Sequence, residues 1–517
     1  MSAIVVPEVL VEMGGAALPE RDARALGEVR VHQALSLPTV CELTFFDPSG
    51  GMADVAEMAP GASLRVRVSG FPAPLFEGEV TAVTHEYNPS GARRVHVRGY
   101  DLLHRLRKRQ PVRSHIQVNA GELARSLVAD LGIPVVAEDP GPLRQQLFQT
   151  GQSDLDLLAE AANRCGCYFI LRDGVLRLTT LAGFGPALPL AWGNGLIEAR
   201  VEINTEGVFR SVEVRAWDPQ RTTPLIGSAT LARTGRNLPT GEGAPVQRTL
   251  VDALARDGAQ ADGIAQAELD RCAAREVVLR AVAEGDPALG PGTPVEITGA
   301  QPPLTGRHVL TAVRHVIDRR QGFVSELETS PPPVREGLRR SVATLGIVTR
   351  VDDPEGMGRI RVVLPNYNDV EAGWFPVVTP GAGPDKGIVA LPDIDDRVLV
   401  MLMDGDPARG VVLGGLYGIA PPPDSGVEGG AVRRYTLATP GGLRVRLDDA
   451  AGTVVVENGS GDHIDLSPKA IVVTDSRGSR IELAADKCRI LSMADLEIAA
   501  PGKKVTIGGQ SIDFERV

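Results

Sequence analysis

The segment from Tyr435 to Val517 constrains the fold more than any other part of the chain, because it repeats one small pattern. A short strand of alternating apolar and polar residues is followed by a polar turn and then by the next strand. Alternation with period two gives each strand a single apolar face. The predicted strands are Leu443–Leu447, Ile464–Leu466, Ile471–Val473, Ile481–Leu483, Leu496–Ile498, Val505–Ile507 and Ile512–Phe514.

Strands with one apolar face need a second apolar surface to pack against. This segment contains only Tyr435 and Phe514 as aromatic residues, which is little for the core of a β-sandwich. The pair Asn458-Gly459 is a hairpin signal that favours the sandwich. We favour three intertwined copies, which would bury every apolar face around one axis as a stiff needle. The residues expected in this trimeric core are Leu443, Val445, Ile464, Leu466, Ile481, Leu483, Leu496, Ile498, Val505 and Ile507.

Composition excludes several classes of protein. A chain of 517 residues is long enough for about three domains. A net charge of −11 argues against a nucleic-acid-binding surface and against adhesion to anionic lipid. Five scattered cysteines do not form a disulfide framework, so we expect reduced thiols and synthesis in the cytoplasm. The first basic residue is Arg21 and apolar runs are short, so we expect neither an N-terminal export signal nor a membrane span.

Turn signals divide the chain into segments. Residues 120–131 are predicted to form a helix that ends at Gly132, and Ser153 is predicted to cap a second helix. Three consecutive prolines from Pro331 mark a boundary, and three more from Pro421 mark another. The predicted domains are a strand-rich domain with inserted helices at 1–335, a small barrel at 341–418, a linker at 419–434 and the needle at 435–517.

Several motifs together resemble one known family. In the first domain they are Ser153–Leu158, Cys167–Phe169, Leu289–Val295 and Gly306–His315. In the barrel they are Gly346–Val348, Asp353-Pro354, Gly358–Val362, Trp374, Gly387, Pro392, Asp396–Val400, Gly405–Pro407 and Val412–Gly414. This ordered set is similar to the valine-glycine-repeat spike proteins (VgrG), the fused hub and spike of contractile injection systems, which are related to the spikes of contractile phage tails.

The resemblance implies a mainly β fold with minor α content. It comprises a hub of tube-like β-barrels with inserted helices, an OB-fold domain and a C-terminal trimeric β-helix needle. It also implies a homotrimer whose partners are an inner tube protein, baseplate proteins and a PAAR-type tip protein, with Ile512, Phe514 and Val517 as the tip-cap residues. The target membrane would be met only by mechanical puncture, and no nucleic acid is bound.

This sequence departs from the secretion-system members of the family. It lacks the charged, asparagine-rich segment that often follows the barrel, and its needle is short, with no appended domain. We therefore expect the spike of an extracellular, phage-tail-like particle, which is assembled in the cytoplasm and can be released. A phage tail spike is the second interpretation.

The sequence offers few candidates for catalysis. The chain has no Walker A, G-x-G-x-x-G or G-x-S-x-G motif. Asp395 and Asp396 are neighbours on a predicted strand, so their side chains should point to opposite faces. Cys165-Gly166-Cys167 lacks the spacing of a zinc or redox pair and is predicted to join a helix to a strand. We expect no catalytic, cofactor or metal site. The alternatives are a spike enzyme that degrades peptidoglycan or polysaccharide and a free-standing adhesin.

Overall fold

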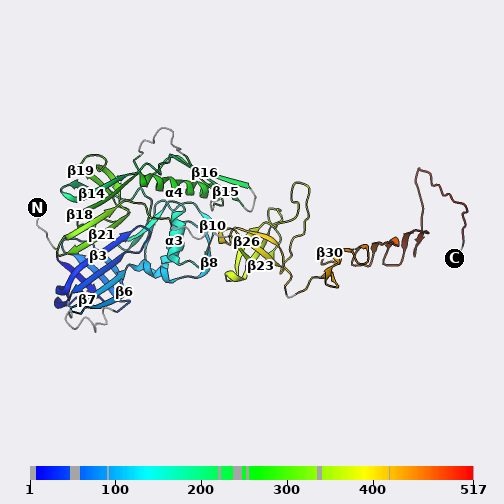
Figure 1. Ribbon diagram of the computed structural model, residues 1–517, viewed down its shortest axis with the longest axis horizontal. Coiled ribbons are helices and arrows are strands. Elements are labelled where there is room, and N and C mark those ends of the chain that lie inside the picture. The colour runs from blue at the N-terminus through cyan, green and yellow to red at the C-terminus, as the bar shows by residue number, and fades with distance from the viewer. Residues whose placement is uncertain are drawn as a thin grey trace. The chain divides into compact units, whose positions relative to one another are not determined.

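A computed structural model gives the fold in two compact units, Met1–Gly415 and Leu416–Val517. The structure describes residues 7–46, 59–89, 92–218, 223–236, 247–251, 255–334, 341–418 and 420–515. Figure 1 shows its strands and helices in chain order. Each unit is described separately below.

The first unit is built on a 14-stranded sheet. One half contains β1 (Val9–Met13), β2 (Ala16–Ala17), β3 (Leu26–Ala34), β4 (Val40–Phe46), β5 (Ser63–Val68), β6 (Phe76–Tyr87) and β7 (Arg93–Tyr100), with helix α1 (Glu20–Ala25) before β3. The other half contains β13 (Leu188–Trp192), β14 (Gly195–Ile203), β18 (Val277–Glu284), β19 (Pro294–Thr298), β20 (Gly306–Val309), β21 (Ala312–Asp318) and β22 (Gly322–Glu328).

The two halves join where β3 pairs with β21, in an antiparallel register that places Val31 opposite His315. Each half keeps its own hydrophobic core. Phe45 and Val97 lie in the first core, and Leu279 and Val295 lie in the second. The β-barrels expected for this part of the chain are therefore joined in one continuous sheet with two cores.

Smaller elements are inserted between the two halves and within the second. They are η3 (Leu102–Lys108), β8 (Val112–Val118), α2 (Ala120–Val128), η4 (Ala129–Leu131), β9 (Val135–Ala137), β10 (Arg144–Thr150), α3 (Asp154–Asn163), β11 (Tyr168–Arg172), β12 (Val175–Thr179), β15 (Ser211–Asp218), β16 (Thr223–Ala229), β17 (Gln247–Leu250) and α4 (Gly258–Glu276).

The helix boundaries follow the predicted capping residues. Ser153 Oγ accepts a hydrogen bond from the Asp156 N–H at 3.2 Å and so caps α3. Gly132, with φ of 67°, ends η4 in the left-handed region that favours glycine. Cys165 and Cys167 are buried free thiols between α3 and β11, as the sequence predicts.

The barrel has five strands in the order β25-β24-β23-β26-β27. Its elements are β23 (Val342–Arg350), β24 (Ile360–Leu364), η5 (Pro365–Tyr367), β25 (Val370–Phe375), β26 (Arg397–Leu402), η6 (Met403–Gly405) and β27 (Gly410–Gly415). The prediction that Asp395 and Asp396 lie on a strand is wrong, because both precede β26. Asp395 has φ of 69°, and Asp396 accepts a hydrogen bond from the Asp393 N–H at 2.8 Å, so these residues build a tight turn.

The Asp353–Arg359 loop explains one of the barrel motifs. The Asp353 carboxylate accepts hydrogen bonds from the Arg359 guanidinium at 2.6 and 2.9 Å, and both side chains are only 3% exposed. The same carboxylate accepts from the backbone N–H groups of Glu355 and Met357, at 3.1 and 3.0 Å. Hydrogen bonds from Arg359 hold the pKa of Asp353 well below its usual range.

The second unit is a meander of seven antiparallel strands in the order β30 to β36. These are β30 (Arg434–Ala438), β31 (Arg444–Asp448), β32 (Thr453–Glu457), β33 (His463–Leu466), β34 (Ala470–Thr474), β35 (Arg480–Ala484) and β36 (Cys488–Leu491), and the small ribbon of β28 (Val427–Glu428) and β29 (Ala431–Val432) precedes them. Its four predicted strands up to Leu483 are confirmed. The sandwich alternative is not seen, since these sheets are the only two among the described residues of the unit.

Three further predicted strands are wrong. The segments 496–498, 505–507 and 512–514 are not strands in the structure. Their residues alternate as in the preceding repeats, but a strand satisfies its backbone hydrogen bonds only beside another strand. The described residues after Leu491 have no such neighbour from their own chain.

Candidate functional site on the C-terminal sheet

The meander places its apolar side chains in two aligned rows. Because alternate residues of a strand point to the same side, both rows lie on one face of the sheet. The first row runs Leu437, Val445, Val456, Ile464, Val473, Ile481, Ile490, and the second runs Tyr435, Leu447, Val454, Leu466, Ile471, Leu483, Cys488. These residues are called the apolar face below.

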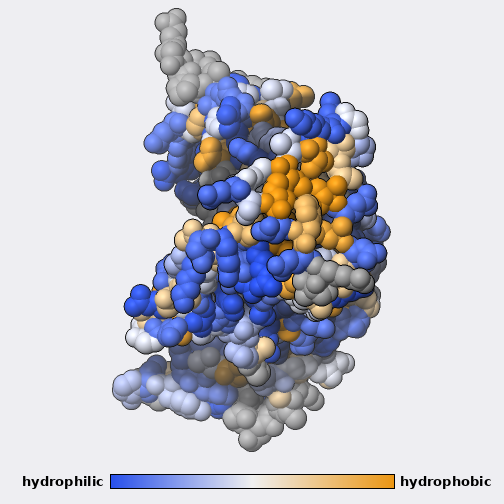
Figure 2. All heavy atoms as spheres, turned by 90° about the vertical axis from the view of Figure 1, so that its right-hand side faces the viewer, coloured by the Kyte–Doolittle hydropathy of each residue, from blue (hydrophilic) through white to orange (hydrophobic). Residues whose placement is uncertain are grey.

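The apolar face is open to solvent. Ile464 is 40% exposed, Ile481 45% and Leu437 69%. The opposite face carries Asp465 and Glu482 but is less exposed, which reverses the usual arrangement of a soluble sheet. Figure 2 shows exposed apolar side chains gathered in one patch of a mainly polar surface.

No buried hydrophobic residue among those described follows Val412. The described residues of the C-terminal unit therefore form no hydrophobic core within one chain, although the strands from β30 to β36 are fully paired. Exposed apolar area of this extent normally marks an interaction surface. The apolar face is the candidate functional site.

Side-chain hydrogen bonds connect the turns along one edge of the sheet. The Asn458 side-chain oxygen accepts from the backbone N–H groups of Ser460 and Asp462, each at 3.0 Å. The Asp462 carboxylate accepts from the Asn458 amide and from the Ser476 N–H of the next turn on that edge, each at 2.7 Å. The Asn458 amide and the Ser476 N–H lower the pKa of Asp462. These bonds hold successive repeats at one spacing and so keep the apolar rows in register.

The structure brings together half of the predicted needle residues. On the apolar face lie Val445, Ile464, Leu466, Ile481 and Leu483. Leu443 precedes β31 in the same alternation and is 55% exposed. Outside the sheet, and exposed, lie Leu496, Ile498, Val505 and Ile507. Of the predicted tip residues, Ile512 is 48% and Phe514 90% exposed, and Val517 lies outside the described residues.

The sequence prediction missed the other members of the apolar face. They are Tyr435, Leu437, Leu447, Val454, Val456, Ile471, Val473, Cys488 and Ile490. The signal that could have found them is the same alternation, followed strand by strand through each turn.

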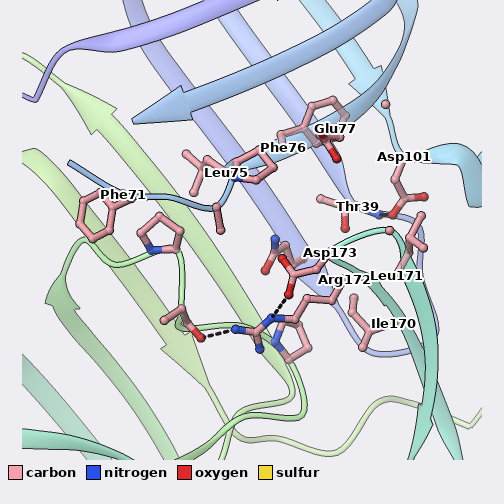
Figure 3. A pocket seen from close by; sticks show the side chains of 18 of the residues that line it. Thr39, Phe71, Leu75, Phe76, Glu77, Asp101, Ile170, Leu171, Arg172 and Asp173 are labelled. Atoms are coloured by element: carbon pink, nitrogen blue, oxygen red, sulfur yellow. Dashed lines mark hydrogen bonds and ion pairs between the residues drawn. The ribbon is translucent and has the colours of Figure 1, made fainter. Parts of the chain in front are cut away.

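The 14-stranded sheet borders a cavity of about 370 Å³ that is lined by the titratable residues Asp101 and Arg172 (Figure 3). Asp101 accepts hydrogen bonds from the backbone N–H groups of Thr39 at 2.7 Å and Leu103 at 3.0 Å, and burial raises its pKa to about 7. Arg172 donates to Thr293 Oγ1 and to the Ala288 carbonyl, both at 2.7 Å. Both side chains thus fasten loops of the first unit.

The described part of the chain offers neither a metal site nor a membrane-spanning helix. No group of three or more His, Cys, Asp or Glu residues there is arranged to hold a metal ion. Among the described helices, none is both long and apolar enough to cross a bilayer.

Two regions of the chain match models of known protein families. Residues 344–417 match the model of the type VI secretion system/phage-baseplate injector OB domain. Residues 8–319, which are more than half of the chain, match the model of the Alg8 N-terminal domain. The chain belongs to the Alg8 N-terminal domain family. In this family member, the matched region contains nearly all of the 14-stranded sheet.

Solved structures with low sequence identity share the fold of this Alg8 N-terminal domain protein. The half-lidded Francisella PdpA-VgrG complex has a TM-score of 0.54 at 7% identity, with 93% of this chain and 87% of that chain covered. An E. coli protein described as a type VI secretion component similar to the T4 phage tail proteins gp27 and gp5 has a TM-score of 0.53 at 13% identity, covering 79% and 99%. No curated protein matches the sequence. The chain therefore shares the fold of these VgrG-like proteins, and residues 344–417 form an injector-type OB domain.

Proposed function

We propose that this protein is the structural hub and membrane-puncturing spike of a contractile injection system and that it works as a homotrimer. The observation that carries the proposal is the apolar face, which is exposed on a unit with no core of its own. Three copies wound around one axis would bury each face against its two neighbours. Full burial of one aliphatic side chain stabilises a protein by roughly 1.5–3 kcal/mol, so these two rows would hold the trimer firmly.

The role we propose is mechanical. Contraction of a sheath would drive the needle through a target envelope, with the hub linked to an inner tube protein and to surrounding baseplate proteins. A PAAR-type protein would cap the exposed residues Ile512 and Phe514. Asp101 supports a structural rather than an enzymatic reading, because both of its oxygens are engaged by backbone N–H groups of the hub.

The setting we propose is an extracellular, phage-tail-like particle that is assembled in the cytoplasm and released. It rests on the direct passage from the barrel through a proline linker into the needle. The domain limits we propose are 1–335 for the hub, 341–418 for the OB-fold domain and 435–517 for the needle.

The proposed assembly predicts a trimer. Purified protein at micromolar concentration should have three times the chain mass by light scattering, and its C-terminal unit should resist protease and heating. The physical reason is that only association removes the apolar face from water. A monomer whose C-terminal unit is equally protease-resistant would contradict the proposal, because that unit would then be stable with its apolar face exposed.

The proposed contact at the tip predicts that a charged substitution there releases the PAAR-type protein. Phe514→Asp should abolish retention of the PAAR-type protein encoded nearby in a pull-down, because it places a charge in an apolar contact. Asp513→Ala, at the adjacent position, is the matched control and should retain the cap. If Phe514→Asp and a deletion of residues 510–517 both retain the cap as well as the unaltered protein does, the cap docks elsewhere.

A further inference from the structure

A small basic pocket in the hub is independent of the needle. It has a volume of about 190 Å³ and lies between the last turns of α4, strand β20 and the segment 233–236. Its lining includes Arg233, Arg236, Arg307 and His308.

The arginines of this pocket differ in how their charge is balanced. Arg233 is neutralised by Asp270 at 2.7 Å and by Asp139 at 2.8 Å. Arg236 donates to the Pro303 carbonyl at 2.5 Å, and Arg307 donates to the Ala182 carbonyl at 2.8 Å. In the part of the chain that the structure describes, neither Arg236 nor Arg307 forms an ion pair with a carboxylate. Both guanidinium groups thus line one hollow and donate to backbone carbonyl oxygens, and the Glu296 carboxylate acts on Arg236 only through space.

The contacts of His308 add a second, independent observation. This side chain is 6% exposed, and its Nε2 lies 2.9 Å from the Leu304 carbonyl oxygen and 2.6 Å from Nη2 of Arg236. One imidazole nitrogen is either a donor or an acceptor. If Nε2 carries a proton, it satisfies Leu304 but faces an N–H of Arg236. If it carries none, it accepts from Arg236 but faces a carbonyl oxygen.

An acceptor placed in the hollow would resolve this conflict. It would take the Nη2 hydrogen of Arg236 and leave Nε2–H to donate to Leu304. Burial and the neighbouring Arg236 both lower the pKa of His308, so a third positive charge beside the two guanidinium groups is unfavourable. A negative ligand would reverse that balance.

We infer that the pocket formed by Arg236, Arg307 and His308 binds a small oxyanion of the phosphate type. Guanidinium groups recognise such oxyanions through paired, charge-assisted hydrogen bonds. The hollow is large enough for a phosphate group and small enough to exclude most of a larger ligand. The anion can be free inorganic phosphate or the phosphate of a phosphomonoester.

The test is calorimetric titration of the full-length protein with inorganic phosphate at constant ionic strength. Arg236→Gln and Arg307→Gln should each weaken binding by about tenfold or more, as expected for the loss of a charge-assisted hydrogen bond. Arg280→Gln is the matched control, because Arg280 is an exposed arginine of the same sheet that pairs with Glu328. It should bind phosphate like the unaltered protein.

A second titration with AMP distinguishes the two sources of the phosphate group. Equal affinity for AMP and phosphate assigns the site to phosphomonoesters, and binding of phosphate alone assigns it to the free ion. Absence of a phosphate signal at 10 mM (roughly the weakest affinity of interest, about 3 kcal/mol of binding free energy) overturns the inference. Unchanged binding in Arg307→Gln also overturns it, and because Arg307 is exposed this variant is expected to fold.

Discussion

Val456→Asp should prevent the C-terminal unit from assembling, although Val456 is 41% exposed in the single chain. Val456 lies in the first row of the apolar face, between Val445 and Ile464. In the proposed trimer the new carboxylate would be buried three times around one axis. An unpaired buried charge costs several kcal/mol per ion, and like charges add to this cost. The expected result is loss of trimer mass and of protease resistance, while the hub stays folded.

Val455→Asp is the matched control, because it changes the same residue type one position away. Val455 is half-buried on the opposite face, between Arg446 and Asp465, so a carboxylate there can meet the Arg446 guanidinium. In the single chain Val455 is less exposed than Val456, so burial there would predict that Val455→Asp is the more harmful change. The proposed trimer predicts the opposite order, because it buries Val456. If Val455→Asp disrupts the assembly and Val456→Asp does not, the inward face of the needle has been assigned wrongly.

Asp353→Ala should destabilise the OB-fold domain by about 3 kcal/mol, because it leaves the buried Arg359 guanidinium with only the exposed Glu355 carboxylate, 3.4 Å away. Both side chains are 3% exposed, and the same carboxylate holds three backbone N–H groups of its loop. The measurement is hydrogen exchange of the amides in residues 341–415 of the intact protein. Faster exchange there, with unchanged exchange in the hub sheet, is the expected result.

Asp352→Ala provides the control. Asp352 pairs with Arg350 at 2.8 Å, but its side chain is 69% exposed, and exposed pairs contribute little. Arg359 lowers the pKa of Asp353 in the folded domain. The Asp353 carboxylate therefore stabilises the domain at every pH above the pKa that Asp353 has in the unfolded chain. This stabilisation is lost only as the pH falls through the lower pKa of the folded domain. Domain stability should therefore depend on Asp353 at neutral and mildly acidic pH alike. Equal exchange rates in the two variants would contradict the assigned role of the buried pair.

Local features of the fold were predictable from the sequence. Ser153 begins α3 and Gly132 ends η4, as expected. Such caps can be predicted because capping depends on only a few neighbouring residues. The apolar face was predictable in outline for the same reason, since alternation places Ile464 and Ile481 on one side of a strand whatever the tertiary context.

Features that depend on distant segments were not predictable. Nothing near Val31 in the sequence indicates that β3 pairs with β21, nearly three hundred residues later, in the continuous hub sheet. The strand expected at 496–498 failed because alternation describes side chains, whereas a strand also needs a neighbour for its backbone. The basic pocket joins Arg236 to Arg307 across separate segments, and two isolated arginines give no signal in a sequence.

The exposed apolar face also makes unassembled chains prone to associate with other proteins during biosynthesis. If the protein is the proposed trimer, each newly made polypeptide presents two rows of apolar side chains until three chains meet, and these rows can associate with any other nascent chain. Encounter of three free needles would slow steeply on dilution. Association of the hubs would instead raise the effective concentration of the needles toward the millimolar range expected for tethered partners. Production of soluble protein should thus be limited by the timing of hub association.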